Sequence, residues 1–186
     1  MLYCQVKMNE EDKDLAVKIV EYNNNAPLIF KKIKQFLLRI IPYKIEVEHI
    51  GSTAVKGLGG KGIIDILIVT EREYMQKIVE LLESSRYKYN PDASTISEKL
   101  FVSGPYWYKE KDLHIHIHIT FFESKEHKDK LLFRDYLRGH PEEAKTYYEL
   151  KKKWSLEAVP DRPKYTELKS SYIRKVLDIA REENQS

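Results

Sequence analysis

The sequence predicts an α/β fold in which a mixed sheet is flanked by helices and followed by a helical C-terminal part. Residues 63–69 are an apolar run containing one carboxylate, which is typical of a strand buried on both faces. Residues 112–120 alternate strictly between apolar and polar side chains, the pattern of a strand with two different faces. Helical spacing of apolar residues over 28–40, and helix signals within 124–182, predict the helices.

Length and composition indicate a single globular domain spanning residues 1–186. An apolar fraction of 42% can build a core, and a charged fraction of 33% suits a chain in water. No apolar run reaches the length of a membrane span, and one cysteine, Cys4, allows no disulfide within the chain. We therefore expect a cytoplasmic protein. The net charge of +3 permits an anionic small-molecule partner and gives no strong nucleic-acid signal, and the oligomeric state stays open.

The N-terminal half is expected to begin with a polar leader over 1–14 and a first strand over 15–20. Asparagine and proline residues at 23–27 signal a helix start, and the helix extends to about Ile41. Residues 45–50 then alternate as a strand that leads into a Gly-Ser turn. These elements come directly before the apolar strand that carries the carboxylate.

The middle of the chain adds further elements to the sheet. After the strand over 63–69 we expect a helix from Tyr74 that ends near Ser84-Ser85, a strand over 99–102 and a turn at Gly104-Pro105. The alternating strand over 112–120 follows.

The C-terminal part, residues 124–182, is predicted to be helical and to belong to the same domain. Ser124 is a suitable N-cap for its first helix. Gly139-His140-Pro141 ends that helix and starts a second one, and Asp161-Arg162-Pro163 starts a last helix that runs to about Arg181.

The Gly51-Ser52 turn is the first candidate for a binding site. Glycine lets the backbone approach a ligand closely, and a neighbouring serine offers N–H and hydroxyl donors to phosphate. The same pair is also compatible with a simple tight turn. Residues 53–62, which contain four glycines and Lys61, are predicted either as a connector or as a loop around a phosphate.

Asp65 is the second candidate, because an ionised carboxylate inside an apolar strand is costly unless it is paired. Its partner could be a hard cation such as Mg²⁺, which takes oxygen ligands and often shares them with substrate phosphates. Backbone N–H groups, a lysine or a histidine could satisfy the carboxylate equally well.

Three histidines, His114, His116 and His118, share the polar face of the strand over 112–120. They could simply be hydrogen-bonded imidazoles. His116 and His118 could also chelate Zn²⁺ or Mn²⁺, together with Asp65 if the two strands are neighbours. Either histidine could instead serve as a general base.

A longer pattern resembles a known family. Glu48-His49-Ile50-Gly51-Ser52-Thr53-Ala54-Val55, followed by Ile64-Asp65-Ile66-Leu67, resembles the nucleotidyltransferase signature of Gly-Ser and then Asp-apolar-Asp/Glu. Leu67 stands where the second metal-binding carboxylate would be. The whole pattern is similar to the GrpB family over about residues 17–180. It also includes Gly57-Leu58, Lys61, His116-Ile117-His118, 132–141 and 165–169. Two positions differ, because Lys56 and Gly62 replace prolines that are common in that family.

The resemblance implies a nucleotidyltransferase-like fold and metal-dependent transfer of a nucleotidyl group from a nucleoside triphosphate to an unknown acceptor. Gly51 and Ser52 would hold the triphosphate, and Lys61 would neutralise phosphate charge. Asp65 would bind Mg²⁺ or Mn²⁺, with Zn²⁺ as a further option. His116 or His118 would complete the site, as a ligand or as a base.

Two further sets of residues follow from the same resemblance. Two-metal transfer usually uses at least two carboxylates, so either Glu46 or Glu48 of the neighbouring strand replaces the one missing at Leu67, or histidines do, or the chemistry is lost. The positions of Arg134, Arg138 and Lys169 match the family, which implies a phosphate clamp. Taken alone, each of these three would be interpreted as a solvated helix residue.

Other functions remain open at this point. Leu67 favours a binding module of the same fold. This module would bind a nucleotide or a metal ion but would have lost catalytic activity. A His/Asp metal site could instead hydrolyse a phosphoester without a nucleotide donor. Lys151-Lys152-Lys153 is predicted to be an exposed helix face rather than a nucleic-acid patch, because no aromatic residues are interleaved with it in a base-stacking pattern.

Overall fold

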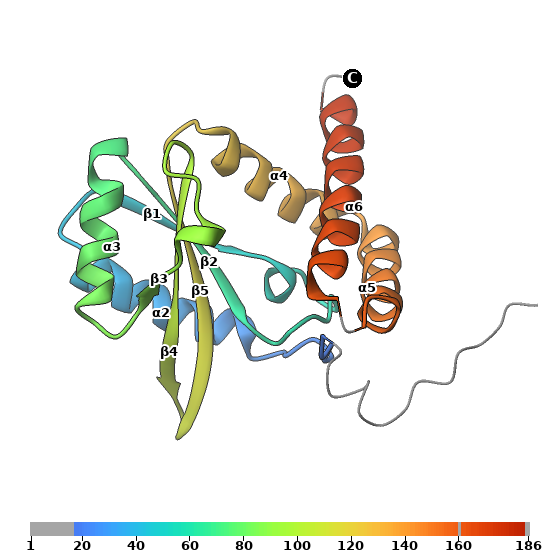
Figure 1. The fold of residues 1–186 in the computed structure, drawn as a ribbon, viewed down its shortest axis with the longest axis horizontal. Helices are drawn as coiled ribbons and strands as arrows, with labels where there is room; N and C mark the ends of the chain where they lie inside the picture. Colours follow the sequence, from blue (N-terminus) through green and yellow to red (C-terminus); the bar gives the residue numbers. More distant parts are fainter. Residues whose placement is uncertain (1–16, 160, 185–186) are drawn as a thin grey trace, which may run out of the picture.

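A five-stranded sheet with helices on both faces forms the centre of the computed structural model, which describes residues 17–159 and 161–184 (Figure 1). The strands are β1 Ile45–Ile50, β2 Ile64–Thr70, β3 Lys88–Tyr89, β4 Lys99–Tyr108 and β5 Lys111–Phe121. The helices are α2 Ala26–Ile40, α3 Met75–Glu83, α4 Lys125–Gly139, α5 Pro141–Glu157 and α6 Arg162–Glu183, with short 3-10 turns η1 Ser52–Ala54, η2 Arg72–Tyr74 and η3 Pro91–Ala93. The predicted mixed sheet and helical C-terminal part are confirmed.

The strand order is β1-β2-β5-β4-β3. β2 and β5 are parallel, whereas the other neighbouring pairs are antiparallel. The parallel register places Asp65 opposite His116 and Leu67 opposite His118. Because side chains alternate between the faces of a strand, all four of these side chains belong to one face of the sheet.

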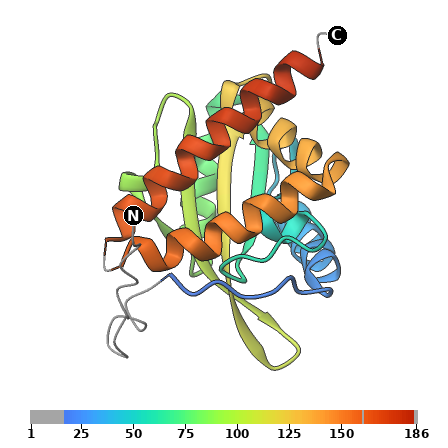
Figure 2. The same cartoon turned by 90° about the vertical axis from the view of Figure 1, so that its right-hand side faces the viewer.

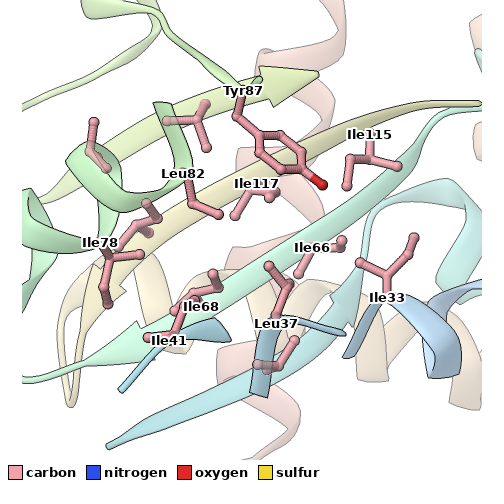
Figure 3. Packing of buried hydrophobic residues seen from close by; sticks show 14 of the residues in the cluster. Ile33, Leu37, Ile41, Ile66, Ile68, Ile78, Leu82, Tyr87, Ile115 and Ile117 are labelled. Carbon is pink, nitrogen blue, oxygen red and sulfur yellow. The ribbon is translucent and has the colours of Figure 1, made fainter. Parts of the chain in front are cut away.

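The opposite face of the sheet forms the main core together with α2 and α3. Ile66 and Ile68 of β2, and Ile115 and Ile117 of β5, are fully buried there (Figure 3). Helical spacing brings the apolar stripe of α2 onto the same face. The α2 side chains in this stripe are Ile29, Ile33 and Leu37.

The face that carries Asp65 is covered by the C-terminal helices. Leu67 and Val69 are fully buried on it, in a small cluster with Ile50, and Leu131 of α4 packs against that cluster. Figure 2 shows α5 and α6 crossing in front of this face. The helical C-terminal part therefore encloses the strand positions that carry the polar residues.

The predicted strand over residues 15–20 is not formed in its described portion. Val20 makes only an isolated bridge to Gly60, through a pair of backbone hydrogen bonds of 2.7 and 2.9 Å. The chain here fixes the glycine-rich loop and adds no strand to the sheet. Residues 15 and 16 and the predicted leader over 1–14 lie outside the described residues.

The predicted turn at Gly104-Pro105 is wrong, because β4 continues through both residues to Tyr108. β3 pairs only with Val102 and Ser103, so β4 is an edge strand beyond that point, and an edge strand tolerates proline. A Cβ on Gly104 would lie 2.8 Å from Cδ1 of Tyr87. The glycine therefore allows close packing and does not mark a turn.

The predicted helix caps of the C-terminal part are confirmed. The Ser124 hydroxyl accepts a hydrogen bond from the His127 N–H at 3.0 Å, and the Asp161 carboxylate accepts one from the Lys164 N–H at 3.0 Å. In the described part of the chain, no helix combines the length and the apolar character needed to cross a membrane.

Truncation of Ile117 tests the main core. Ile117 is fully buried on the central strand β5, so Ile117→Ala removes apolar contacts and leaves a cavity. We expect the free energy of unfolding to fall by about 2–5 kcal/mol, measured by chemical denaturation. Ile96→Ala is the control, because Ile96 is 81% exposed and should change stability by less than about 0.5 kcal/mol. Equal effects of the two changes would contradict this packing.

Candidate functional site

A hydrogen-bonded pair, Asp65 and His116, lies at the centre of the candidate site. Oδ1 of Asp65 is 3.1 Å from Nδ1 of His116, across the parallel strands β2 and β5. Burial opposes ionisation of Asp65, but the hydrogen bond from His116 and the positive charge of Lys169 hold its pKa below the usual range. Asp65 is therefore an ionised carboxylate that fixes the orientation of the His116 ring.

The Gly51-Ser52 turn lies directly beside Asp65. Gly51 has a φ of +71°, and a Cβ at this position would lie 2.3 Å from Oδ2 of Asp65. The backbone can therefore approach the carboxylate only because residue 51 is glycine. The turn is braced from behind, where the Thr53 hydroxyl is 3.0 Å from Nε2 of the buried His49 and donates a hydrogen bond to the Ile63 carbonyl.

The glycine-rich loop folds back over the same turn. A Cβ on Gly60 would lie 2.2 Å from Oγ of Ser52 and 3.6 Å from Nζ of Lys151. Gly60 is also the residue that bridges to Val20. The loop therefore brings a backbone segment, a serine hydroxyl and a lysine ammonium into one small space.

A cavity of about 210 Å³ opens between the Asp65 face of the sheet and helices α4, α5 and α6. Of the residues predicted for the site, the structure brings eight to this cavity or its immediate wall. They are Gly51, Ser52, Lys61, Asp65, His116, His118, Arg134 and Lys169. The apolar part of the wall includes Leu137, Phe133 and the rings of Tyr147 and Tyr165.

Lys151 corrects the prediction of an exposed lysine face. Its side chain is only 4% exposed, and its ammonium donates a hydrogen bond to the Gly59 carbonyl. Burial, and then the charge of Lys169, lowers the pKa of Lys151 to about 7, although Asp65 acts in the opposite direction. The sequence did contain a signal, because Lys151 lies on the same helical stripe as Tyr147 and Trp154.

Four lysines from separate segments approach the cavity, and we call them the lysine group: Lys61 of the loop, Lys130 of α4, Lys151 of α5 and Lys169 of α6. Burial lowers the pKa of Lys169, as do the charges of Lys130 and Lys61, whereas Asp65 raises it. The ammonium of Lys61 lies 5.7 Å from the ring centroid of Tyr165, within cation–π range. The lysine group and Asp65 therefore share one electrostatic environment.

Arg134 binds to the protein itself. The Arg134 side chain is 9% exposed. Its guanidinium donates to Oε2 of Glu48 at 2.5 Å and to the His49 carbonyl at 3.1 Å, and it makes two hydrogen bonds to Asp135, at 2.7 and 2.9 Å. These contacts tie α4 to β1. Its predicted role as a phosphate clamp stays a prediction, and the structure gives it a positioning role.

Arg138 lies outside the main cavity. It donates to the Ala54 carbonyl at 2.9 Å and to Asp135 at 3.2 Å, and it lines a separate surface pocket with Tyr22 and Lys56. Its hydrogen bond therefore holds the end of the η1 turn. A direct contact of Arg138 with a ligand in the main cavity has no support in this arrangement.

The other histidines have different surroundings. Nδ1 of His118 is buried and has no hydrogen-bond partner among the described residues, and burial, followed by the charge of Lys130, keeps its pKa well below the ordinary value. His118 is therefore neutral. Desolvation also lowers the pKa of His49, to about 4, and this ring stacks on Phe30 in the opposite face of the sheet. His114 is exposed, lies beside His116, and does not line the cavity.

The predicted metal ligands are only partly assembled. Glu48 is held by Arg134, and Glu46 is exposed on the edge strand β1. Leu67 fills the position of the second carboxylate with a fully buried apolar side chain. Among the described residues, no three His, Cys, Asp or Glu side chains form a group that could hold a metal ion. These residues do not fit a two-ion centre, and a single ion at Asp65 with His116 or His118 stays a prediction.

Comparison with known proteins places this arrangement in a family. The model of the GrpB protein family matches residues 16–178. The chain belongs to the GrpB family. A UPF0157 protein of Pseudomonas aeruginosa is 34% identical over 135 residues, covering 72% of this chain and 54% of that protein. The glutamate-rich protein GrpB of Alkalihalophilus pseudofirmus is 27% identical over 165 residues, covering 87% of this chain and 94% of that protein.

Solved structures support the fold. The crystal structure of the conserved protein GrpB from Enterococcus faecalis is 30% identical, has a TM-score of 0.75, and matches 91% of this chain and 100% of that one. A structure of the Cid1 poly(U) polymerase is 15% identical, with a TM-score of 0.50 over 78% of this chain and 47% of that chain. At this identity the likeness shows the fold alone, which is nucleotidyltransferase-like.

Several relatives are longer than the matched region. The chain spans about half the length of the Pseudomonas aeruginosa protein and of the UPF0157 protein YqkA of Bacillus subtilis, at 54% and 47% respectively. The comparisons establish the family and the fold.

Substitution of Gly51 tests the contact between the turn and Asp65. Gly51→Ala combines an unfavourable positive φ with a clash against the Asp65 carboxylate, so we expect a loss of about 2–4 kcal/mol in the free energy of unfolding. Gly57→Ala is a matched control, since Gly57 has a φ of +80° but nothing within 4 Å of its added Cβ, and should cost about 1 kcal/mol. Denaturant unfolding measures both, and equal losses would refute the clash.

Replacement of Lys151 tests the burial of its ammonium. The pKa of Lys151 is about 7 in the folded protein, compared with the ordinary value of 10.5. Between pH 7 and 10.5 the unfolded chain therefore binds more protons than the folded chain, and the free energy of unfolding rises with pH across this range. Lys151→Met should remove this slope and stabilise the ligand-free protein by about 1–3 kcal/mol at pH 7.5, after the loss of the hydrogen bond to Gly59 is counted.

The control for this change is Lys152→Met, because Lys152 is partly exposed and pairs with Glu149. It should leave stability within about 0.5 kcal/mol of the original protein and keep the pH slope. Urea denaturation from pH 7 to 10 compares the three proteins. A destabilised Lys151→Met protein with an unchanged pH slope would show that the ammonium is well solvated.

Proposed function

We propose that this GrpB-family protein transfers a nucleotidyl group from a nucleoside triphosphate to an acceptor that carries a hydroxyl group. The observation that carries the proposal is the Asp65–His116 pair, placed beside the Gly51-Ser52 turn in a cavity lined by lysines. The nucleotidyltransferase-like fold and the likeness to Cid1, a poly(U) polymerase, support the same reaction class.

The phosphates of the donor would occupy the basic part of the cavity. Ser52 offers a hydroxyl group, and the close approach of Gly51 to Asp65 places the turn directly beside the carboxylate in the cavity wall. Lys61 and Lys169 would neutralise phosphate charge. Phosphoryl chemistry depends mainly on positioning and charge stabilisation, and the cavity supplies groups for both.

His116 would handle the proton of the acceptor. Its Nδ1 faces Asp65, so Nε2 is the nitrogen that could accept a proton from an acceptor hydroxyl. The resulting oxygen would form a bond to the α-phosphorus, the bond from that phosphorus to the bridging oxygen would break, and pyrophosphate would leave. Asp65 would stabilise the imidazolium that forms, as a carboxylate does in a hydrolase triad.

A second candidate is a binding module that holds a nucleotide and has no transfer activity. The observation in its favour is Leu67, which is fully buried where a second carboxylate would be needed to hold two metal ions. This module would use the same cavity and the same lysines. The two candidates differ only in turnover.

The test of transfer uses a nucleoside triphosphate labelled at the α-phosphate and a panel of hydroxyl-bearing small molecules, short RNA and proteins as acceptors. We expect label transfer and pyrophosphate release, with a loss of at least about 100-fold in Asp65→Asn and in His116→Asn, because each change removes the base or its orienting partner. The control is Glu80→Gln, an exposed residue of α3 on the opposite side of the sheet, which should keep full activity.

Two outcomes are informative. Full activity in His116→Asn would overturn its role as the base. Triphosphate binding without transfer to any acceptor would favour the binding module. Thermal unfolding of each variant checks that Asp65→Asn and His116→Asn remain folded, so that lost activity reports on chemistry.

A further inference from the structure

The nucleotidyltransferase-like fold suggests transfer with two metal ions, but the cavity has too few carboxylates to hold two ions. Two-metal transfer positions both ions with at least two carboxylates. Leu67 is apolar and fully buried, and Glu48 is engaged by Arg134 at 2.5 Å. Among the described residues that line the cavity, Asp65 is the one carboxylate. The negative side chains that would attract two divalent cations are therefore missing from this part of the wall.

Positively charged side chains line the same cavity. The lysine group reaches the cavity from the loop, α4, α5 and α6, and Arg134 adds a fifth basic side chain to the wall. The charges of Lys130 and Lys61 act on Lys169, the charge of Lys169 acts on Lys151, and the charge of Lys130 acts on His118. These interactions converge on the cavity from three helices and one loop.

The protein offers the lysine group few counter-charges, because Asp65 is the one carboxylate among the described residues of the cavity wall that acts on Lys151 and Lys169. In the described part of the chain, neither Lys151 nor Lys169 makes an ion pair with a carboxylate, and Lys130 has only Glu126, at 3.6 Å. Glu126 also lies 3.9 Å from Lys99. Like charges that are partly removed from water repel each other, and unpaired charges there are costly. An anion with several charges would relieve both effects.

The cavity is also shaped for a ligand of this kind. Gly60 lets the loop pack directly against Ser52, where a Cβ would lie 2.2 Å from Oγ, and this packing keeps the Ser52 hydroxyl and the ammonium of Lys151 at the wall of a cavity of about 210 Å³. Lysine is a common phosphate ligand and acts as a point charge from any direction. Ammonium groups on several sides of one small cavity therefore suit a chain of linked phosphates better than a single carboxylate ligand.

We propose that the lysine group takes the place of the metal ions, so that this cavity binds the polyphosphate group of its ligand directly and without a divalent cation. The ligand class is a nucleoside triphosphate or another linear polyphosphate. The inference rests on the proposed function, since it concerns the donor site of the same reaction. Lys130, Lys151 and Lys169 contact the phosphates, and Asp65 orients His116.

The experiment measures binding of inorganic tripolyphosphate and of a nucleoside triphosphate by titration calorimetry, once in EDTA and once in excess Mg²⁺. We expect binding in EDTA that is at least as tight as in Mg²⁺, because Mg²⁺ chelated by the ligand reduces the charge that the lysines attract. Affinity should fall steeply as salt is raised.

Two variants connect the binding to the cavity. Lys130→Met and Lys169→Met should each weaken binding in EDTA by about tenfold, which is the effect of losing one charge-assisted hydrogen bond. Lys152→Met removes a neighbouring charge outside the cavity wall and should change affinity by less than about twofold. Thermal unfolding confirms that each variant is folded. If one of the two cavity variants is unstable, the other still tests the proposal.

The outcomes separate this inference from the proposed function. Binding that requires Mg²⁺ would overturn the inference and leave the transferase proposal standing. Binding in EDTA that Lys130→Met and Lys169→Met do not weaken would overturn it as well, because the anion would then sit elsewhere on the basic surface. Absence of binding in both conditions would overturn the inference and the transferase proposal together.

Discussion

Parallel pairing of β2 with β5 is the constraint on which the rest of the site depends. It brings Asp65 and His116 together although 51 residues separate them in the sequence, and it gives the 3.1 Å contact between their side chains. On the other face of the same two strands, the isoleucines form the main core with α2 and α3. One register therefore fixes both the buried core and the polar pair, and a shift of one residue would exchange them.

Arginine contacts hold the helical layer against this sheet. Arg134 joins α4 to Glu48 and to the backbone of His49, and Arg138 joins α4 to the backbone at Ala54. Charge-assisted hydrogen bonds of this kind are stronger than neutral ones, and breaking one leaves a buried charge unpaired. The position of α4, and with it one wall of the cavity, is therefore set by residues that the family pattern suggested as ligand contacts.

The apolar run of β2 and the alternation of β5 predicted these two strands, because both patterns have clear periods. The sequence left open whether the two strands are neighbours and which group pairs with Asp65, because strand order depends on the whole fold. The sequence was insufficient wherever contacts between distant parts of the chain determine the role of a residue. Lys151 belongs to a run of three lysines, and only its place on the stripe with Tyr147 and Trp154 distinguishes it from Lys152. Gly104 looks like a turn residue, but its role is to admit the Tyr87 ring. Glu48 looked available to a metal, and only the fold shows that Arg134 occupies it.

The enclosure of the Asp65 face by α4, α5 and α6 has a consequence for synthesis on the ribosome. When the chain has emerged as far as β5, its sheet can already pack against α2 and α3, but Ile50, Leu67 and Val69 still lack the helices that cover them. Lys169 is contributed by the last helix, α6. The apolar cluster on this sheet face therefore stays bare in the nascent protein until α4, which carries Leu131, has emerged, and the binding site, which includes Lys169 of α6, is the last part to be completed.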